Sequence, residues 1–349
     1  MESKKTIAIP PGATIREQLL QRGMSQKDFA IRMDMSEKHI SNLINGKVEL
    51  THDTAIRLES VLGVPAQFWS NMESIYREQE ARVREENELE GDVTIAKMMP
   101  YAECARLGWF VATRDNQEKV FELRRFFEVA RLKTIEGLKL PGIAYRVASA
   151  NSKSMYTQAI WAQKARLMSR SAHTGPTNIE KLKKKLTEIR VLTTKSPEEF
   201  YDDLVSTLSS CGIALVVLQH IKGSFLHGAT FYEGNRIVLA LTVRGKDADK
   251  FWFSLFHELG HIVLGHISQT SVDESAEKKA DEFARNALVP PDKYAAFVER
   301  GQFSEEDIQY FAKMIGIAPG IVLGRLQNEN YVPYDRFHRL KVQYELVAE

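Results

Sequence analysis

Residues 251–261 read Phe-Trp-Phe-Ser-Leu-Phe-His-Glu-Leu-Gly-His, a bulky apolar run that ends in two histidines four residues apart. On an α-helix, residues four apart lie one turn apart on one face, so His257 and His261 can point imidazole nitrogens at one ion. Glu258 is turned aside, where its carboxylate can reach a water on that ion. We therefore predict a buried helix with a His-Glu-x-x-His zinc motif. The alternative is a helix with two partly exposed histidines and a surface glutamate.

A second, acidic helix is expected at 273–284, where Glu277 and Asp281 again share a face. The arrangement resembles the gluzincin pattern, which implies Glu277 as third metal ligand and Asp281 as the acceptor that holds a ligand histidine by its far ring nitrogen. Glu274 is the reserve ligand, and the alternative is a charged helix face. His266 competes for the third position, but on a continuous helix it would point away from the pair, so we interpret it as a histidine at the helix end.

These residues carry a family resemblance. Phe251–His261, Glu277–Ala284 and Leu288-Val-Pro290 resemble the ImmA/IrrE family of metallopeptidases, and Cys211-Gly-Ile-Ala-Leu-Val-Val and Gly228-Ala-Thr-Phe are similar to its usual lead-in. The resemblance covers about residues 195–295, and more loosely 115 to the C-terminus. It implies a Zn²⁺-dependent endopeptidase that cleaves a repressor or another regulatory protein.

The resemblance also implies a role for each site residue. Glu258 would take a proton from zinc-activated water and deliver it to the leaving amine. Asp281 stands where asparagine is common in the family, but aspartate accepts the same hydrogen bond. His227 and Tyr232 are candidates for an additional oxyanion donor.

A second motif lies at 23–47, where two short helices are expected to follow Ser25 and Ser36 as N-caps. Small Ala30 suits a close helix crossing. This segment resembles the lambda-repressor/Cro class of helix-turn-helix and, with its flanks, HigA-type antitoxins. The likeness implies double-stranded operator DNA and a homodimer as partners. The implied phosphate contacts are Gln26 and Lys47, and the implied base contacts are Glu37, Lys38, His39 and Asn42.

The balanced charge of the N-terminal segment permits an interpretation other than DNA binding. Residues 1–75 carry equal numbers of basic and acidic side chains, which predicts weak non-specific DNA affinity. A small helical bundle used for dimerisation or for gripping a protein is the other interpretation.

The remaining pattern divides the chain into four parts. We predict a helix-turn-helix domain at 1–75, a charged linker helix at 76–92, a helical middle region at 93–195, and a gluzincin-like metallopeptidase domain at 196–349. Strands are expected at 213–218, 229–232 and 236–241, with helices from 248 onward. The predicted fold class is α+β and mostly helical, because the strands and helices come in blocks.

Composition sets the compartment that we expect. The chain has 349 residues, 44% hydrophobic and 27% charged, with a formal net charge of +1. Its two cysteines lie outside any CxxC, no apolar run is long enough for a membrane span, and no secretory signal is visible, so a cytoplasmic protein is expected.

Together these features predict a DNA-binding regulatory zinc endopeptidase that cuts a repressor or a toxin. The alternative is a HigA-like antitoxin and autorepressor that binds DNA and a partner without proteolysis. A third possibility is metal-dependent sensing, in which zinc alters DNA affinity.

Overall fold

The computed structural model describes residues 2–3, 6–137, 152–224, 226–242, 247–268 and 274–344. The chain forms two compact units, Met1–Thr94 and Ile95–Glu349. Of the predicted middle region at 93–195, residues 138–151 lie outside the described part. Among the described residues, no helix has both the length and the apolar composition needed to cross a bilayer.

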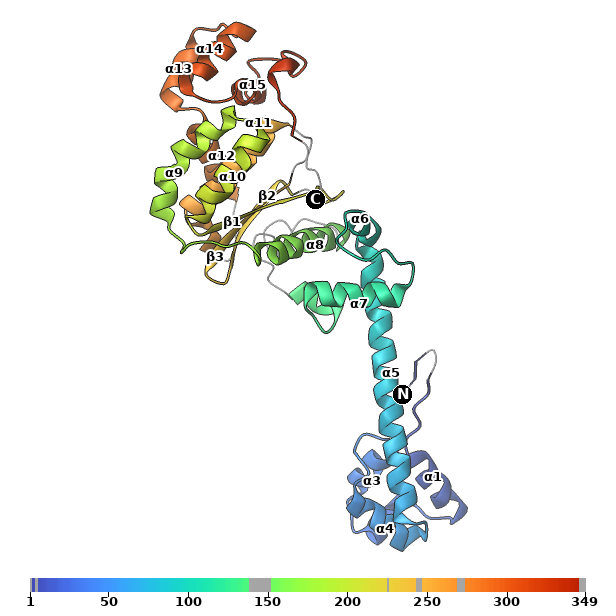
Figure 1. Ribbon diagram of the computed structural model, residues 1–349. Coiled ribbons are helices and arrows are strands. Elements are labelled where there is room, and N and C mark those ends of the chain that lie inside the picture. The colour runs from blue at the N-terminus through green and yellow to red at the C-terminus, as the bar shows by residue number, and fades with distance from the viewer. Residues whose placement is uncertain are drawn as a thin grey trace. The chain divides into compact units, whose positions relative to one another are not determined.

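The first unit is a small all-helical bundle (Figure 1). Ser25 and Ser36 cap α2 and α3 as predicted, accepting hydrogen bonds from the backbone N–H groups of Asp28 and His39. Its core contains Phe29, Ile40 and Trp69, all fully buried. Its helices are α1 (Gly12–Gln21), α2 (Gln26–Met33), α3 (Glu37–Ile44), α4 (His52–Leu62) and most of α5 (Ala66–Met98).

A close crossing of α1 and α3 depends on glycine. A β-carbon on Gly12 would lie 2.0 Å from the carbonyl oxygen of Ile44, so no larger residue fits there without moving a helix.

Helix α5 is longer than the linker helix that we predicted at 76–92. It runs unbroken through Gly91 to Met98. A glycine inside a helix costs only about 1 kcal/mol relative to alanine, so it does not by itself end one. Ion pairs one turn apart add support, with Arg77 Nε 2.7 Å from Glu73 and Arg77 Nη1 2.9 Å from Glu80.

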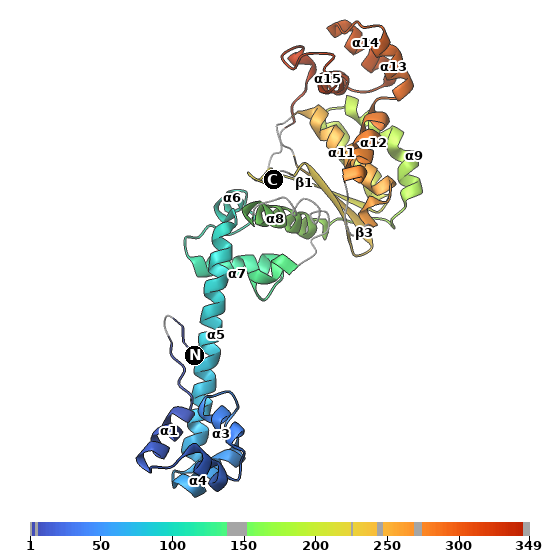
Figure 2. The same cartoon turned by 180° about the vertical axis from the view of Figure 1, so that it is seen from behind.

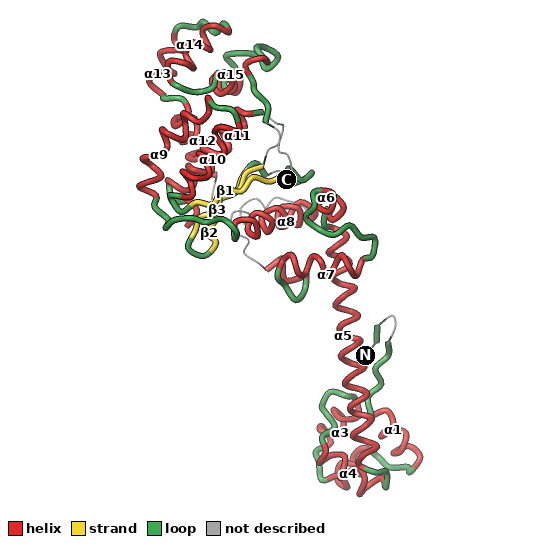
Figure 3. Tube along the Cα trace, viewed as in Figure 1, coloured by secondary structure: helices red, strands yellow, loops and turns green. Residues whose placement is uncertain are grey.

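The second unit is mostly helical around one small sheet (Figure 3). Before the sheet come α6 (Tyr101–Arg106), α7 (Asn116–Phe127), α8 (Ser152–Ser169), α9 (Ile179–Val191) and α10 (Pro197–Ser209). The strands are β1 (Ile213–Leu218), β2 (Gly228–Glu233) and β3 (Arg236–Thr242). Then follow α11 (Ala248–Val263), the 3₁₀ turn η4 (His266–Ser268), α12 (Glu274–Leu288), α13 (Pro291–Glu299), α14 (Glu305–Ile315) and α15 (Pro319–Asn328).

The sheet has the strand order β1-β3-β2. Strand β1 is parallel to β3, with Ile213 opposite Ile237, and β2 is antiparallel to β3, with Thr230 opposite Leu239. Gly234, at φ +59°, makes the predicted hairpin turn between β2 and β3. Strand β2 therefore forms one edge of the described sheet. The mostly helical α+β class predicted from the sequence is confirmed.

The sheet lies between α8 on one face and helices α9 to α12 on the other (Figures 1 and 2). Helix α11 packs on β2 and β3 and against α12 and α15. Its apolar residues Trp252, Phe256 and Leu259 are fully buried in the main core. The predicted buried helix therefore carries the histidine motif into the interior of this unit.

Candidate metal centre and DNA-binding residues

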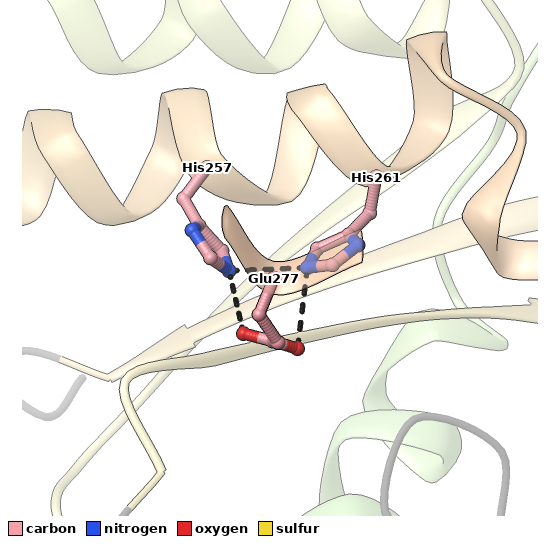
Figure 4. Close-up of side chains that lie close together, drawn as sticks. All are labelled: His257, His261 and Glu277. Carbon is pink, nitrogen blue, oxygen red and sulfur yellow. Dashed lines mark hydrogen bonds and ion pairs between the residues drawn. The ribbon is translucent and has the colours of Figure 1, made fainter. Parts of the chain in front are cut away.

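Helix α11 places its two motif histidines side by side. The Nε2 atoms of His257 and His261 lie 3.1 Å apart, and both side chains are largely buried. Figure 4 shows both rings pointing from one helix face toward the carboxylate of Glu277.

Glu277 reaches this pair from α12. Its Oε2 lies 3.4 Å from His257 Nε2, and its Oε1 lies 3.6 Å from His261 Nε2. Small residues let the two helices approach, since a β-carbon on Gly260 would lie 3.3 Å from the Cα atom of Ala280. The carboxylate and two imidazoles thus meet in one cluster.

The three donor atoms fit the demands of zinc. Zinc binds imidazole nitrogen and carboxylate oxygen at about 2.0–2.1 Å, and tetrahedral geometry then sets neighbouring ligand atoms roughly 3.3 Å apart. The separations of 3.1, 3.4 and 3.6 Å lie around that value. Two histidines and one carboxylate would leave the fourth coordination position of zinc open for water or substrate, as in catalytic zinc sites.

Both histidines have a partner on the far side of the ring. Asp281 Oδ1 lies 2.7 Å from His257 Nδ1, and His266 Nδ1 lies 3.0 Å from His261 Nδ1. When each Nδ1 carries the proton and donates it to that partner, each Nε2 lone pair is free for a metal.

His266 lies beyond the end of the motif helix, so the direction expected on a continuous helix does not apply to it. Helix α11 ends at Val263, and Gly265, at φ +76°, turns the chain so that η4 brings the buried His266 back against His261. His266 lies outside the His257–His261–Glu277 cluster. Its contact is with the back of a cluster histidine.

The acidic neighbours also change the proton affinity of His257. Burial by itself lowers the pKa of this imidazole, but the hydrogen bonds with Asp281 and Glu277 and the charge of Glu258 outweigh it. They raise the pKa of His257 to about 9.

Glu258 packs against two residues of β2. Its side chain is buried, and Thr230 Oγ1 donates a hydrogen bond to its Oε2 at 2.5 Å. Gly228 provides the space, since a β-carbon there would lie 2.6 Å from Glu258 Oε1. Neither contact could be predicted from the motif, because both join residues about thirty positions apart.

The predicted DNA-contacting residues all lie on or next to α2 and α3 of the first unit. Gln26 begins α2, Glu37 begins α3, and both are exposed. Of the other four, Lys38 and Lys47 are exposed, and His39 and Asn42 are half-buried. Five of the six side chains therefore belong to one helix pair, and Lys47 follows shortly after α3.

Two known protein families match this chain, one in each compact unit. Residues 15–69 match the helix-turn-helix family model. Residues 220–327 match a peptidase family model described as the IrrE N-terminal-like domain.

The chain therefore belongs to the helix-turn-helix regulators and carries an IrrE N-terminal-like domain.

Two curated relatives support the helix-turn-helix assignment. The uncharacterized HTH-type transcriptional regulator YddM of Escherichia coli (strain K12) is 35% identical over 71 residues, which are 20% of this chain and 76% of that protein. Virulence-associated protein I of Dichelobacter nodosus is 36% identical over 70 residues, 20% of this chain and 65% of that protein. The helix-turn-helix domain makes this chain a DNA-binding regulator.

The IrrE-like domain contains a cavity of about 430 Å³ that reaches the cluster. His227, Glu258 and Glu277 line it. Of the two oxyanion candidates, His227 is therefore at the cavity, whereas Tyr232 is 42% exposed and does not line it. Glu274, the reserve ligand, is exposed and pairs with Lys278 at 2.8 Å.

Proposed function

We propose that this protein is a DNA-binding regulator whose IrrE-like domain is a zinc-dependent endopeptidase. Its substrate would be a protein partner such as a repressor or a toxin. The observation that carries the proposal is the placement of Glu258. A metal site with a structural role needs His257, His261 and Glu277, but it does not need a second buried carboxylate held beside them.

The residues then take distinct roles. His257, His261 and Glu277 would hold zinc, which supplies a water of lowered pKa and polarises the scissile carbonyl. Glu258, whose Oε2 accepts a hydrogen bond from Thr230, takes up a proton and passes it to the leaving amine. Asp281 and His266 keep the two ligand rings in the orientation that the metal requires.

Strand β2 supplies a place for an extended substrate. As an edge strand of the described sheet it has backbone groups on its outer side that a peptide can pair with. The same strand carries Gly228 and Thr230, which contact Glu258. A peptide paired along β2 would therefore lie beside the proton-transferring carboxylate.

For the first unit, we propose that Gln26 and Lys47 contact phosphates of operator DNA. Glu37, Lys38, His39 and Asn42 would approach base edges, because they lie on the second helix of the motif. A homodimer would place two such helices on two half-sites. In this arrangement the protein would act at its operator and on its protein partner through separate units.

A Glu258→Gln variant tests the proposed function. Glutamine preserves the size of the side chain but cannot accept the proton, so cleavage should fall by about 10²–10⁴-fold while zinc content stays unchanged. The measurement compares new peptide N-termini in a cell lysate incubated with zinc-loaded wild type or variant. Equal cleavage by the two proteins would contradict the assigned mechanism. Retained DNA and partner binding with no cleavage by wild type would favour the antitoxin alternative.

A further inference from the structure

The cavity of the IrrE-like domain extends beyond the metal centre into a region lined by charged residues. Four basic side chains line it, together with one carboxylate that belongs to none of the proposed zinc-site roles. They are Lys250, Arg285, Arg325, Lys341 and Asp249.

Both lysines are neutralised by aspartates. Lys250 Nζ lies 2.7 Å from Asp247 Oδ2, and Lys341 Nζ lies 3.0 Å from Asp249 Oδ2. The second pair is well buried, with side-chain exposures of 16% and 9%. Neither lysine therefore offers an unmatched charge to a ligand.

The guanidinium of Arg325 also has partners within the protein. Its Nε lies 3.0 Å from Glu329 Oε1, and its guanidinium lies 3.8 Å from the ring centre of Tyr294. Its Nη1 also donates to two backbone carbonyls of the α12 C-terminus, each at 3.2 Å. These contacts fix Arg325 as a structural cation.

Arg285 differs from these three cations. In the part of the chain that the structure describes, no carboxylate lies within ion-pair distance of its half-buried guanidinium. Arg285 follows Glu277 and Asp281 at successive intervals of four residues, so all three lie on one face of α12. This face therefore presents the metal ligand and the unmatched cation to the same cavity.

The surroundings of Arg285 favour an anionic ligand. Phe253, Leu288 and Ile321 also line the cavity. Apolar walls lower the local dielectric and strengthen a charge pair relative to one in water. A guanidinium binds a carboxylate through two parallel hydrogen bonds, which gives both affinity and orientation.

We propose that Arg285 determines specificity by binding a carboxylate of the substrate peptide. This inference rests on the proposed peptidase function. Eight residues of helix separate Glu277 from Arg285, or about 12 Å along the axis. An arginine side chain reaches back toward the helix N-terminus and shortens that span. At about 3.3 Å per extended residue, the carboxylate lies roughly two or three residues from the scissile bond.

The carboxylate has two possible sources, an acidic side chain or the free C-terminus of the peptide. A peptide library made by digesting a whole proteome distinguishes them. Zinc-loaded wild type is incubated with the library, and Glu258→Gln gives the background. Enrichment of Asp and Glu at a fixed position identifies the side chain, whereas cleavage at a fixed distance from the peptide end identifies the C-terminus. Blocking the C-termini as amides abolishes only the second pattern.

Substitution of Arg285 then tests the residue itself. We expect Arg285→Gln to reduce the carboxylate preference at least about tenfold and Arg285→Glu to favour Lys and Arg at that position. Zinc content should equal that of wild type in both. Arg300→Gln is the matched control, an exposed arginine on the C-terminal side of α13.

The outcomes separate the two claims. Cleavage with no carboxylate preference, or a preference that survives Arg285→Gln, overturns the role of Arg285 and leaves the peptidase intact. No cleavage above the Glu258→Gln background overturns the proposed function, and the role of Arg285 falls with it.

Discussion

The β-carbon position of Gly228 lies 2.6 Å from Glu258 Oε1 and 2.8 Å from Glu258 Cγ. The first residue of β2 thus sets how far the Glu258 side chain can extend. Because Thr230, two residues further along the strand, holds the other carboxylate oxygen, β2 fixes the carboxylate from two sides.

Gly228→Ala should therefore displace Glu258 without moving the proposed metal ligands. We expect hydrolysis to fall by about 100-fold, since a shift of about 1 Å at a reacting group has an effect of that order. Zinc content and melting temperature should change little. Gly91→Ala, at a position with open space around it, is the control. Full activity of Gly228→Ala would show that the position of Glu258 is not critical.

His266→Phe should weaken zinc binding. Phenylalanine fills the buried space but cannot accept the proton of His261 Nδ1, and loss of such a partner typically costs 10–100-fold in metal affinity. Competition with a chromogenic chelator measures the effect. His173→Phe, on an exposed loop, should bind zinc as wild type does. An unchanged affinity in His266→Phe would remove His266 from the site.

Zinc uptake should depend on pH because zinc displaces a proton. His257, with a pKa raised to about 9, is mostly protonated at pH 7 in the metal-free protein, and a protonated imidazole cannot bind a metal. Apparent affinity should therefore rise with pH, by about tenfold per unit, until pH approaches 9. Calorimetry in two buffers of different ionisation enthalpy should detect about one proton released at pH 7.

Asp281→Asn provides the comparison for that experiment. It replaces the carboxylate whose hydrogen bond raises the pKa of His257 with a neutral acceptor, so the rise in affinity should level off at a lower pH. Zinc uptake at pH 7 with no proton release in the wild type would contradict the account.

The proposed DNA contacts predict two different defects. Lys47→Ala should weaken binding to every duplex and reduce the slope of log affinity against log salt by about 0.9, because one phosphate contact is lost. Asn42→Ala should relax base preference at a cost of about 1–3 kcal/mol on the selected operator. Both are measured on duplexes selected from a random library, with the exposed Lys293→Ala of α13 as control. Unchanged salt slopes and preferences would point to the protein-gripping alternative.

The spacing of residues within one helix predicted much of the site, but it predicts nothing beyond the end of that helix. Residues four apart on one helix are neighbours whatever the rest of the fold does, which is why His257 and His261 meet. The same rule cannot place His266, which the sequence put at the helix end, because the rule holds only within a continuous helix and α11 ends at Val263. Gly265, with its positive φ, turns the chain just after α11. A glycine four residues after the second histidine is the sequence signal for this helix end.

Contacts between distant segments lay beyond this reasoning. The sequence predicted the β2–β3 hairpin, but no pattern within either segment pairs β1 parallel to β3 or places Thr230 against Glu258. Arg285 could have been noticed, since it continues the four-residue spacing of Glu277 and Asp281. Its lack of a carboxylate partner in the described structure depends on where the other charged residues fold.

The most direct test of the account is the zinc content of the purified chain, compared with that of His257→Ala. The account predicts about one zinc ion per wild-type chain and a loss of that zinc in the variant, because His257 is one of the three proposed protein ligands. A wild-type chain that contains no zinc when purified without chelator, and takes up none when zinc is added, would contradict it.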